Sequence, residues 1–302
     1  MQRRSLLKNL GGLLVAPAAL SLPTPSSRPK KPVLRLAHIT DVHLKDKWNA
    51  PARFRRCLQH IHSQSPRVDM LLNGGDIVFD MNKENLDIIG AQWQLWHSTL
   101  KAESSLPIHY CLGNHDIWWN EDDKGQALYG KKYALDQLGL SSPYYSFSQN
   151  SWKFIVLDSC HLDIDGTWYI GRLGDTQFAW LDSELKATPA TTPVCVLSHI
   201  PILTATNLVE DNIINKWTMD GGSMHTDTSK IIDLFYAHPN VKLCLSGHIH
   251  LREKLVYNNV TYICDGAVSG AWWEGNRRQT APGYGLIDLY ADGSFDETYV
   301  NY

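Results

Sequence analysis

Short apolar runs alternate with segments of helical periodicity over most of the chain. Most of the runs are rich in Val, Ile and Leu, and each is closely followed by Gly, Asp, Ser or Asn, as buried strands commonly are. The runs that we interpret as buried strands are Val33–Ile39, Met70–Leu72, Ile108–Leu112, Phe154–Leu157, Val194–Leu197 and Val241–Leu245. Because strands that alternate with helices usually form parallel sheets, this pattern predicts an α/β fold with largely parallel strands.

Amphipathic helices are predicted between these strands. Apolar residues recur at spacings of three and four over residues 54–61, 86–100 and 178–185, which places them on one face of a helix. Asp175 precedes the last of these segments and is predicted to be its N-cap.

The last third of the chain has a different pattern. Val260–Cys264, Gly285–Leu289 and Glu297–Val300 are predicted strands without a helix-length segment between them, so we expect hairpins or a second sheet edge. Residues 117–151 and 201–228 are rich in Trp, Asn, Asp and Gly and are predicted to be long loops, which in a compact domain are commonly lids or binding loops.

The first 32 residues differ in composition from the rest of the chain. The pair Arg3 and Arg4 precedes an apolar run over residues 10–22, which has the length of a signal-peptide core and is short for a membrane span. The paired arginines resemble the twin-arginine export signal. We therefore expect recognition by the twin-arginine export machinery, an extracytoplasmic location such as the bacterial periplasm, and no stable membrane span. The predicted parts are a signal peptide over residues 1–22, a proline-rich linker over 23–32 and one domain over 33–302.

Charge and cysteine content narrow the function classes. With 28 basic and 31 acidic residues the formal net charge is -3, so the chain has no broad basic surface and we expect no nucleic-acid duplex as partner. Four of the six cysteines lie inside apolar, strand-like runs, which predicts buried thiols rather than disulfides.

Side chains of the metal-ligating type follow five of the predicted strands. Such positions converge in an open α/β sheet, because ligands bind beyond the carboxyl ends of its strands. Asp, His and Asn are ligands for first-row divalent metals, and this many suit two ions that share a carboxylate. In chain order the candidate ligands are Asp41, His43, Asp76, Asn114, His199, His248 and His250.

These residues fall in five motifs that resemble those of the calcineurin-like metallophosphoesterases. The motifs keep the order and approximate spacing of that family, and the resemblance covers about residues 33–290. It implies a four-layer αββα sandwich of two mixed sheets with flanking helices, and metal-dependent hydrolysis of a phosphoester. The motifs are Asp41-x-His43, Gly75-Asp76, Gly113-Asn114-His115-Asp116, His199 and Gly247-His248-x-His250.

The resemblance also implies roles for individual residues. Two metal ions, of Fe, Mn, Zn or Co, would share Asp76, and the hydroxide that bridges them would attack the phosphorus. His115 would assist the leaving group, and Asp116 would orient His115. One ion would be held by Asp41, His43, Asp76 and His250, and the other by Asp76, Asn114, His199 and His248.

Two positions separate this chain from the purple acid phosphatases of the same superfamily. That type carries a tyrosine ligand where Phe79 stands here, and it lacks a histidine at the position of His43. The chain is therefore more similar to the phosphodiesterase branch, and the expected substrate is a small-molecule diester such as a cyclic nucleotide, a glycerophosphodiester or a nucleotide diphosphate. The alternatives are a phosphomonoesterase or protein phosphatase of the same fold and, less favoured, a non-catalytic scaffold.

Four further residues are candidate substrate contacts. His161 follows the fourth strand, and His225 lies in the long loop after His199. Trp272 and Trp273 follow the last motifs and could form an aromatic shelf for a base, sugar or head group. Alternatively, the two histidines lie in solvated loops and the two tryptophans pack in the core.

Overall fold

The computed structural model describes residues 30–119, 124–162, 169–206 and 220–302, and Lys31–Tyr302 form one compact unit. The predicted signal peptide, residues 1–22, lies outside the described residues. Within the described ranges, no helix has both the length and the apolar character needed to cross a membrane.

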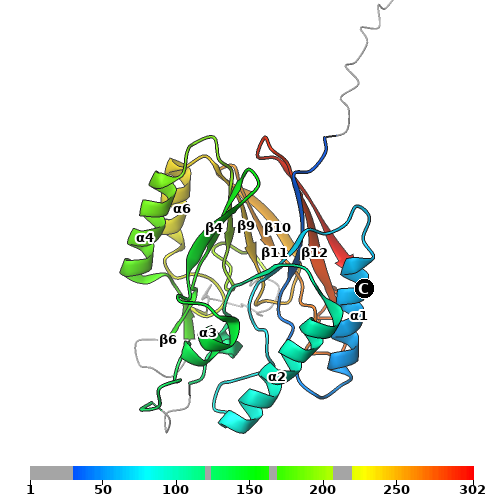
Figure 1. Cartoon of the computed structure of the whole chain (residues 1–302). Coiled ribbons are helices and arrows are strands. Elements are labelled where there is room, and N and C mark those ends of the chain that lie inside the picture. The colour runs from blue at the N-terminus through cyan, green and yellow to red at the C-terminus, as the bar shows by residue number, and fades with distance from the viewer. Residues whose placement is uncertain (1–29, 120–123, 163–168, 207–219) are drawn as a thin grey trace, which may run out of the picture. The chain divides into compact units, whose positions relative to one another are not determined.

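Two mixed sheets form the centre of this unit (Figure 1). The first has the order β13-β12-β1-β2-β3, in which β1, β2 and β3 are parallel, β12 is antiparallel to β1, and β13 is antiparallel to β12. Its strands are β1 (Leu34–Ile39), β2 (Met70–Asn73), β3 (Ile108–Tyr110), β12 (Gly283–Leu289) and β13 (Phe295–Asn301).

The second sheet has the order β10-β11-β9-β8-β5-β4, with four parallel strands between antiparallel edges. A separate two-stranded antiparallel sheet consists of β6 (Cys160–Leu162) and β7 (Tyr169–Gly171). The strands of the second sheet are β4 (Tyr145–Gln149), β5 (Trp152–Val156), β8 (Val194–Leu197), β9 (Val241–Ser246), β10 (Glu253–Tyr257) and β11 (Val260–Cys264).

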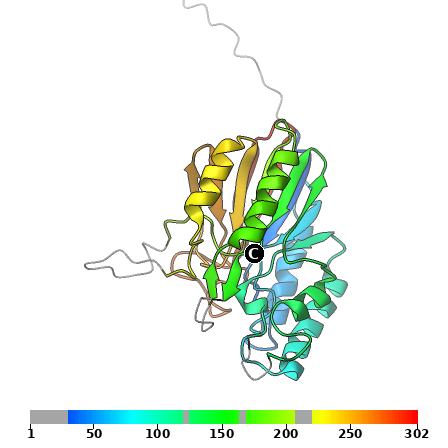
Figure 2. The ribbon, with the colours of Figure 1, turned by 90° about the vertical axis from the view of Figure 1, so that its left-hand side faces the viewer.

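The layers arise because the side chains of each strand point alternately to the two faces of its sheet. On β1, Leu36 belongs to the core between the sheets, whereas the adjacent Ala37 packs beneath α1 (Ala50–His62) and α2 (Leu86–Glu103). On β8, Leu197 faces the same inner core and Val196 packs beneath α4 (Gly174–Ala187) and α6 (Thr228–Ala237). Successive side chains of a strand point to opposite faces, so one helix pair covers each outer face (Figures 1 and 2). The predicted four-layer αββα sandwich is confirmed.

Some local predictions are wrong. The predicted loop over residues 117–151 contains α3 (Lys132–Leu138), which ends at Gly139 with a positive φ of 65°, and strand β4. A helix of two turns is too short for its periodicity to stand out. Asp175 lies inside the first turn of α4, and Leu173 is the N-cap. The sequence pattern also gave no prediction for β10 or α6.

The six cysteines are all buried free thiols, as predicted. Burial raises the pKa of each of these thiols, for example that of Cys57. They therefore act as small apolar core residues.

Candidate metal centre

The ends of five strands bring the predicted ligands to one rim of the sandwich. Five of the seven have a positive φ, between 45° and 69°. Residues other than glycine rarely adopt this conformation, and where they do so together the surrounding structure must hold them there. The five residues are Asp41, His43, Asp76, His248 and His250.

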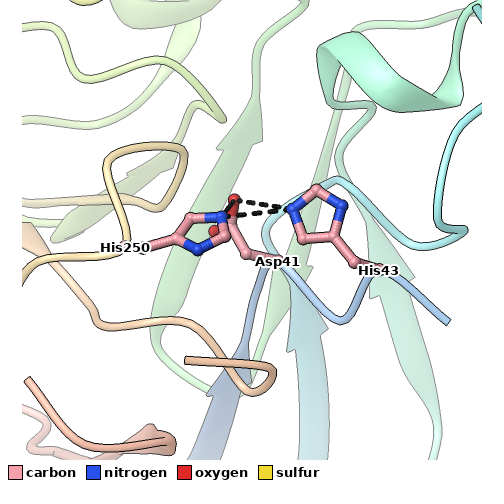
Figure 3. A group of neighbouring side chains, drawn as sticks. All are labelled: Asp41, His43 and His250. Atoms are coloured by element: carbon pink, nitrogen blue, oxygen red, sulfur yellow. Dashed lines mark hydrogen bonds and ion pairs between the residues drawn. The ribbon is translucent and has the colours of Figure 1, made fainter. Parts of the chain in front are cut away.

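One group of donor atoms is formed by Asp41, His43 and His250 (Figure 3). The His250 Nε2 lies 3.1 Å from Asp41 Oδ1, and the His43 Nε2 lies 3.9 Å from the same oxygen. The two Nε2 atoms are 3.1 Å apart. All three side chains are buried, so their donor atoms converge on a site shielded from bulk water.

A second group is formed by Asp76, His199 and His248. The His199 Nε2 lies 3.2 Å from Asp76 Oδ2 and 3.2 Å from the side-chain oxygen of Asn114, which begins the 3-10 helix η1 (Asn114–Asp116). Asp76 Oδ2 also lies 3.6 Å from His43 Nε2. Asp76 therefore connects the two donor groups.

Backbone carbonyls fix which nitrogen of three histidines faces the site. The Nδ1 atoms of His43, His199 and His250 lie 3.3, 2.8 and 2.6 Å from the carbonyl oxygens of Phe79, Gly74 and Gly270, in that order. A carbonyl only accepts, so Nδ1 carries the proton and the Nε2 of a neutral ring is left with a lone pair. The lone pairs of His43 and His250 face each other, and a cation between them satisfies both. The donor set thus fits metal ions.

The electrostatics of the rim favour bound positive charge. Burial raises the pKa of Asp76, but the adjacent histidines outweigh burial and hold it well below its usual range. Burial lowers the pKa of His199, but Asp76 outweighs that effect and raises it to about 9. At His248 burial prevails and lowers the pKa to about 3. Asp76 is therefore ionised and His248 is neutral at physiological pH, whereas His199 carries a proton that a bound cation would replace.

Two glycines allow the carboxylates to approach the backbone. A Cβ atom at Gly113 would collide with the Asp76 side chain, and one at Gly247 would collide with Thr40 and Asp41. The close approach brings the His248 N–H within 2.9 Å of Asp41 Oδ2 and the His115 N–H within 2.9 Å of Asp76 Oδ1. Larger residues at either glycine would displace a candidate ligand.

The predicted role of Asp116 as the residue that orients His115 is wrong. Asp116 is fully buried, and its carboxylate accepts hydrogen bonds from the backbone N–H groups of Gly113, Ile77 and Val78. Burial and the adjacent Asp76 raise the pKa of Asp116 to about 7. Asp116 therefore holds together the two loops that carry Asp76 and Asn114.

His115 is paired with Asp80 instead. The His115 Nδ1 lies 3.2 Å from Asp80 Oδ1, and the His115 side chain keeps 23% of its surface exposed at the rim. Burial lowers the pKa of His115, but Asp76 and Asp80 together raise it above its usual value. Sequence reasoning missed Asp80, although it lies four residues after Asp76 in the same strand-end loop, and that proximity was the available signal.

The structure separates the two tryptophans predicted as substrate contacts. Trp272 is half-buried and stacks on His43 with ring centroids 3.7 Å apart. Trp273 is only 3% exposed and donates its indole N–H to the His43 carbonyl at 3.0 Å. The prediction that Trp273 contacts substrate is therefore wrong, because its ring belongs to the core beneath α1 and α2.

The two histidines predicted as substrate contacts also differ. His225 is 1% exposed, and its ring nitrogens meet the Ser198 hydroxyl at 3.0 Å and the Asp227 carboxylate at 3.1 Å. A substrate role for His225 is wrong, since neither nitrogen is available. His161 lies in β6, 3.3 Å from the Asp158 carbonyl, and remains a predicted contact.

Comparison with known proteins agrees with this geometry. The family model described as calcineurin-like phosphoesterase matches residues 34–252. A 3',5'-cyclic-nucleotide phosphodiesterase from Nostoc is 26% identical over 278 residues, which cover 87% of this chain and 90% of that protein. The 3',5'-cyclic adenosine monophosphate phosphodiesterase CpdA of Haemophilus influenzae is 24% identical, with 88% and 89% covered.

A solved structure has the same fold. The dimetal phosphatase from Danio rerio superposes with a TM-score of 0.65 at 16% identity, covering 90% of this chain and all of that one. The motifs, the rim geometry and the family match together show that this chain is a metal-dependent phosphoester hydrolase belonging to the calcineurin-like phosphoesterase family.

Proposed function

We propose that the protein is a dinuclear-metal phosphodiesterase that hydrolyses 3',5'-cyclic nucleotides. The observation that carries the proposal is the sharing of one rim by two donor groups through Asp76, which lies 3.2 Å from His199 and 3.6 Å from His43. The relatives from Nostoc and Haemophilus influenzae, named as cyclic-nucleotide phosphodiesterases, support a cyclic diester as substrate.

The proposed chemistry assigns distinct tasks to the side chains of the rim. A bound pair of metal ions would supply an activated water and hold the phosphoryl oxygens. The first ion would be held by Asp41, His43, Asp76 and His250, and the second by Asp76, Asn114, His199 and His248.

His115 is proposed to protonate the leaving oxygen. Its partly exposed ring lies among His43 and Asp76, where a phosphate at the donor atoms would meet it. Asp80 holds the Nδ1 side of the ring, so the other nitrogen is directed away from this carboxylate. Trp272 packs edge-on against His115 with centroids 4.8 Å apart and limits the access of water to that side.

Substrate competition between ester classes tests the proposal. The purified mature chain, loaded with manganese, is assayed with cyclic AMP, bis-(p-nitrophenyl) phosphate and p-nitrophenyl phosphate. We expect kcat/KM for the cyclic diester to exceed that for the monoester by at least about 100-fold, a difference of roughly 2.7 kcal/mol. A higher kcat/KM for the monoester would replace the proposal with a phosphomonoesterase.

We also propose that the chain is exported by the twin-arginine route. The proposal rests on Arg3 and Arg4 before the apolar run over residues 10–22. Replacement of both arginines by lysine should keep the activity in the cytoplasmic fraction of a bacterial host, whereas the unchanged chain should reach the periplasm. Equal distribution of the two chains would contradict this route.

A further inference from the structure

Three aromatic rings form a continuous strip that leads outward from the candidate metal centre. Trp272 stacks on His43, and Phe79 packs edge-on against Trp272 with centroids 5.3 Å apart. Trp48 continues the strip, with its ring 5.4 Å from that of Phe79. The strip starts at a candidate ligand and ends on the surface.

The outer part of the strip is partly exposed. Phe79 is half-buried, and Trp48 is 45% exposed at a backbone φ of 51°. Single exposed apolar residues are ordinary, but this one adjoins two other aromatic rings and a metal-binding rim. Trp48 and Asn49 both have a positive φ in the turn that leads into α1, and this turn holds the Trp48 ring at the surface.

Positive charge borders the same strip. The Lys45 ammonium lies 4.3 Å from the centre of the Phe79 ring, and that of Lys47 lies 5.9 Å from the Trp48 ring. Lys45 and Lys47 also line a hollow of about 440 Å³ against residues of α2 such as Gln92 and Leu95. Asp46 lines the same hollow, so the charged residues beside the strip are two lysines and one aspartate.

We infer that Trp48 and Phe79 form the subsite for the flat heterocyclic base of the substrate, with Lys45 beside it. This inference rests on the proposed function, since a cyclic nucleotide joins its phosphodiester to a ribose and a base in one compact molecule. With the phosphate at the donor atoms, the base extends toward the rings next to His43. Aromatic side chains bind bases by stacking on their faces, whatever the base.

The phosphate end and the base end are thus recognised by different residues. A change of the Phe79 side chain leaves its backbone carbonyl, which contacts His43, in place. The Trp48 ring packs against Phe79 and is separated from His43 by Phe79 and Trp272. The base subsite can therefore be removed while the donor atoms stay in place. It predicts selectivity for nucleotide diesters over diesters that lack a ring.

The test compares Trp48→Ala and Phe79→Leu with the unchanged, manganese-loaded chain on two substrates. Cyclic AMP carries a base, and glycerophosphocholine is a diester without one. Tyr236→Ala, which removes another exposed ring that is 70% accessible on α6, is the matched control. Metal content and melting temperature are measured for every variant.

We expect KM for cyclic AMP to rise about 10-fold in each strip variant, equivalent to about 1.4 kcal/mol of stacking. In Trp48→Ala, whose ring does not contact a candidate ligand, the kcat, the metal content and the kinetics with glycerophosphocholine should stay unchanged, as should all values for Tyr236→Ala. An unchanged KM for cyclic AMP, or an equal rise for both substrates, would overturn the inference.

A binding measurement separates this inference from the proposed function. Quenching of tryptophan fluorescence by AMP needs no turnover, and we expect the Kd to rise about 10-fold in Phe79→Leu. If the unchanged chain hydrolysed no diester but bound AMP through these rings, the proposed reaction would fail and the subsite would stand. Binding of AMP that is unaffected by both strip variants would remove the subsite.

Discussion

Two histidine–aspartate pairs in this protein have nearly the same separation and opposite surroundings. The Nδ1 of His115 lies 3.2 Å from Asp80, and the Nδ1 of His225 lies 3.1 Å from Asp227. The His115 side chain is 23% exposed beside the donor groups, whereas the His225 side chain is fully buried.

The difference shows that spacing alone does not define a catalytic pair. His225 contacts Ser198 through one ring nitrogen and Asp227 through the other, and the three residues follow the order of a nucleophilic triad. Yet Ser198 is 1% exposed and donates its hydroxyl proton to the Ile200 carbonyl at 2.8 Å. No substrate carbonyl or phosphoryl group can reach it, so this triad ties the loop after β8 to the sandwich.

The largest expected effect is at Asp76, which connects the two donor groups next to His115. Asp76→Asn removes one negative charge from a carboxylate next to both His43 and His199. We expect kcat to fall by more than about 1,000-fold and at least one metal ion to be lost. Turnover and elemental analysis of the same sample measure this, and full activity in Asp76→Asn would contradict its bridging position.

The second effect directly contrasts the two histidines. His115→Ala should lower kcat by about 100- to 10,000-fold, the usual contribution of a general acid, with little change in melting temperature. His225→Ala should keep kcat within about fivefold but cost about 1–3 kcal/mol of folding free energy, since Ser198 and Asp227 lose a buried partner. Thermal unfolding and steady-state kinetics on both variants suffice, and the reverse pattern would invert the assignment.

A smaller effect separates the two aspartates near His115. Asp80→Asn should lower kcat about 10-fold, since it weakens the contact that positions the ring, and should leave stability nearly unchanged. Asp116→Ala should instead destabilise the fold, because three backbone N–H groups lose their acceptor. Chemical denaturation with parallel activity assays distinguishes them. A stable Asp116→Ala with a selective loss of kcat would restore the original expectation that Asp116 orients His115.

The smallest effect is a pH-dependent stability difference at the buried pair. Burial raises the pKa of Asp227, but hydrogen bonds from His225 and Leu173 outweigh it and hold the pKa below its usual 3.8. The folded state therefore favours the ionised form, and its stabilisation is present above about pH 4 and lost as the pH falls through the lower folded value. The melting temperature of Asp227→Asn should lie below that of the unchanged chain at pH 7, and the gap should close in acid. A gap that is constant with pH would rule out ionisation as its source.

Much of the fold and the rim could be predicted from the sequence because both depend on local patterns. The strand ends carry their polar residues directly after apolar runs, so Asp41 after β1 and His199 after β8 were identifiable without tertiary information. Asp76 and Asn114 lie close together because they follow the neighbouring parallel strands β2 and β3, whereas their contacts with His199 also require the second sheet to pack against the first.

The misassigned residues depend on contacts between separate loops. Asp116 is adjacent to His115 in sequence, but the 3-10 turn directs its carboxylate into the backbone of the loop after β2. The same loop after β2 carries Asp80, which contacts His115 although the two residues are 35 positions apart in the sequence. Likewise, Trp272 is half-buried and its neighbour Trp273 is buried. Successive side chains point in different directions, and only the tertiary structure decides which one is buried.

Metal stoichiometry measured together with turnover is the most direct test of a dinuclear metal centre. The purified chain is stripped with a chelator, reloaded with manganese, and analysed for metal per chain while cyclic AMP hydrolysis is followed. We expect two ions per chain, no turnover after chelation and recovery on reloading. Full turnover of the stripped chain, or a single ion at full activity, would contradict the two donor groups as a dinuclear centre.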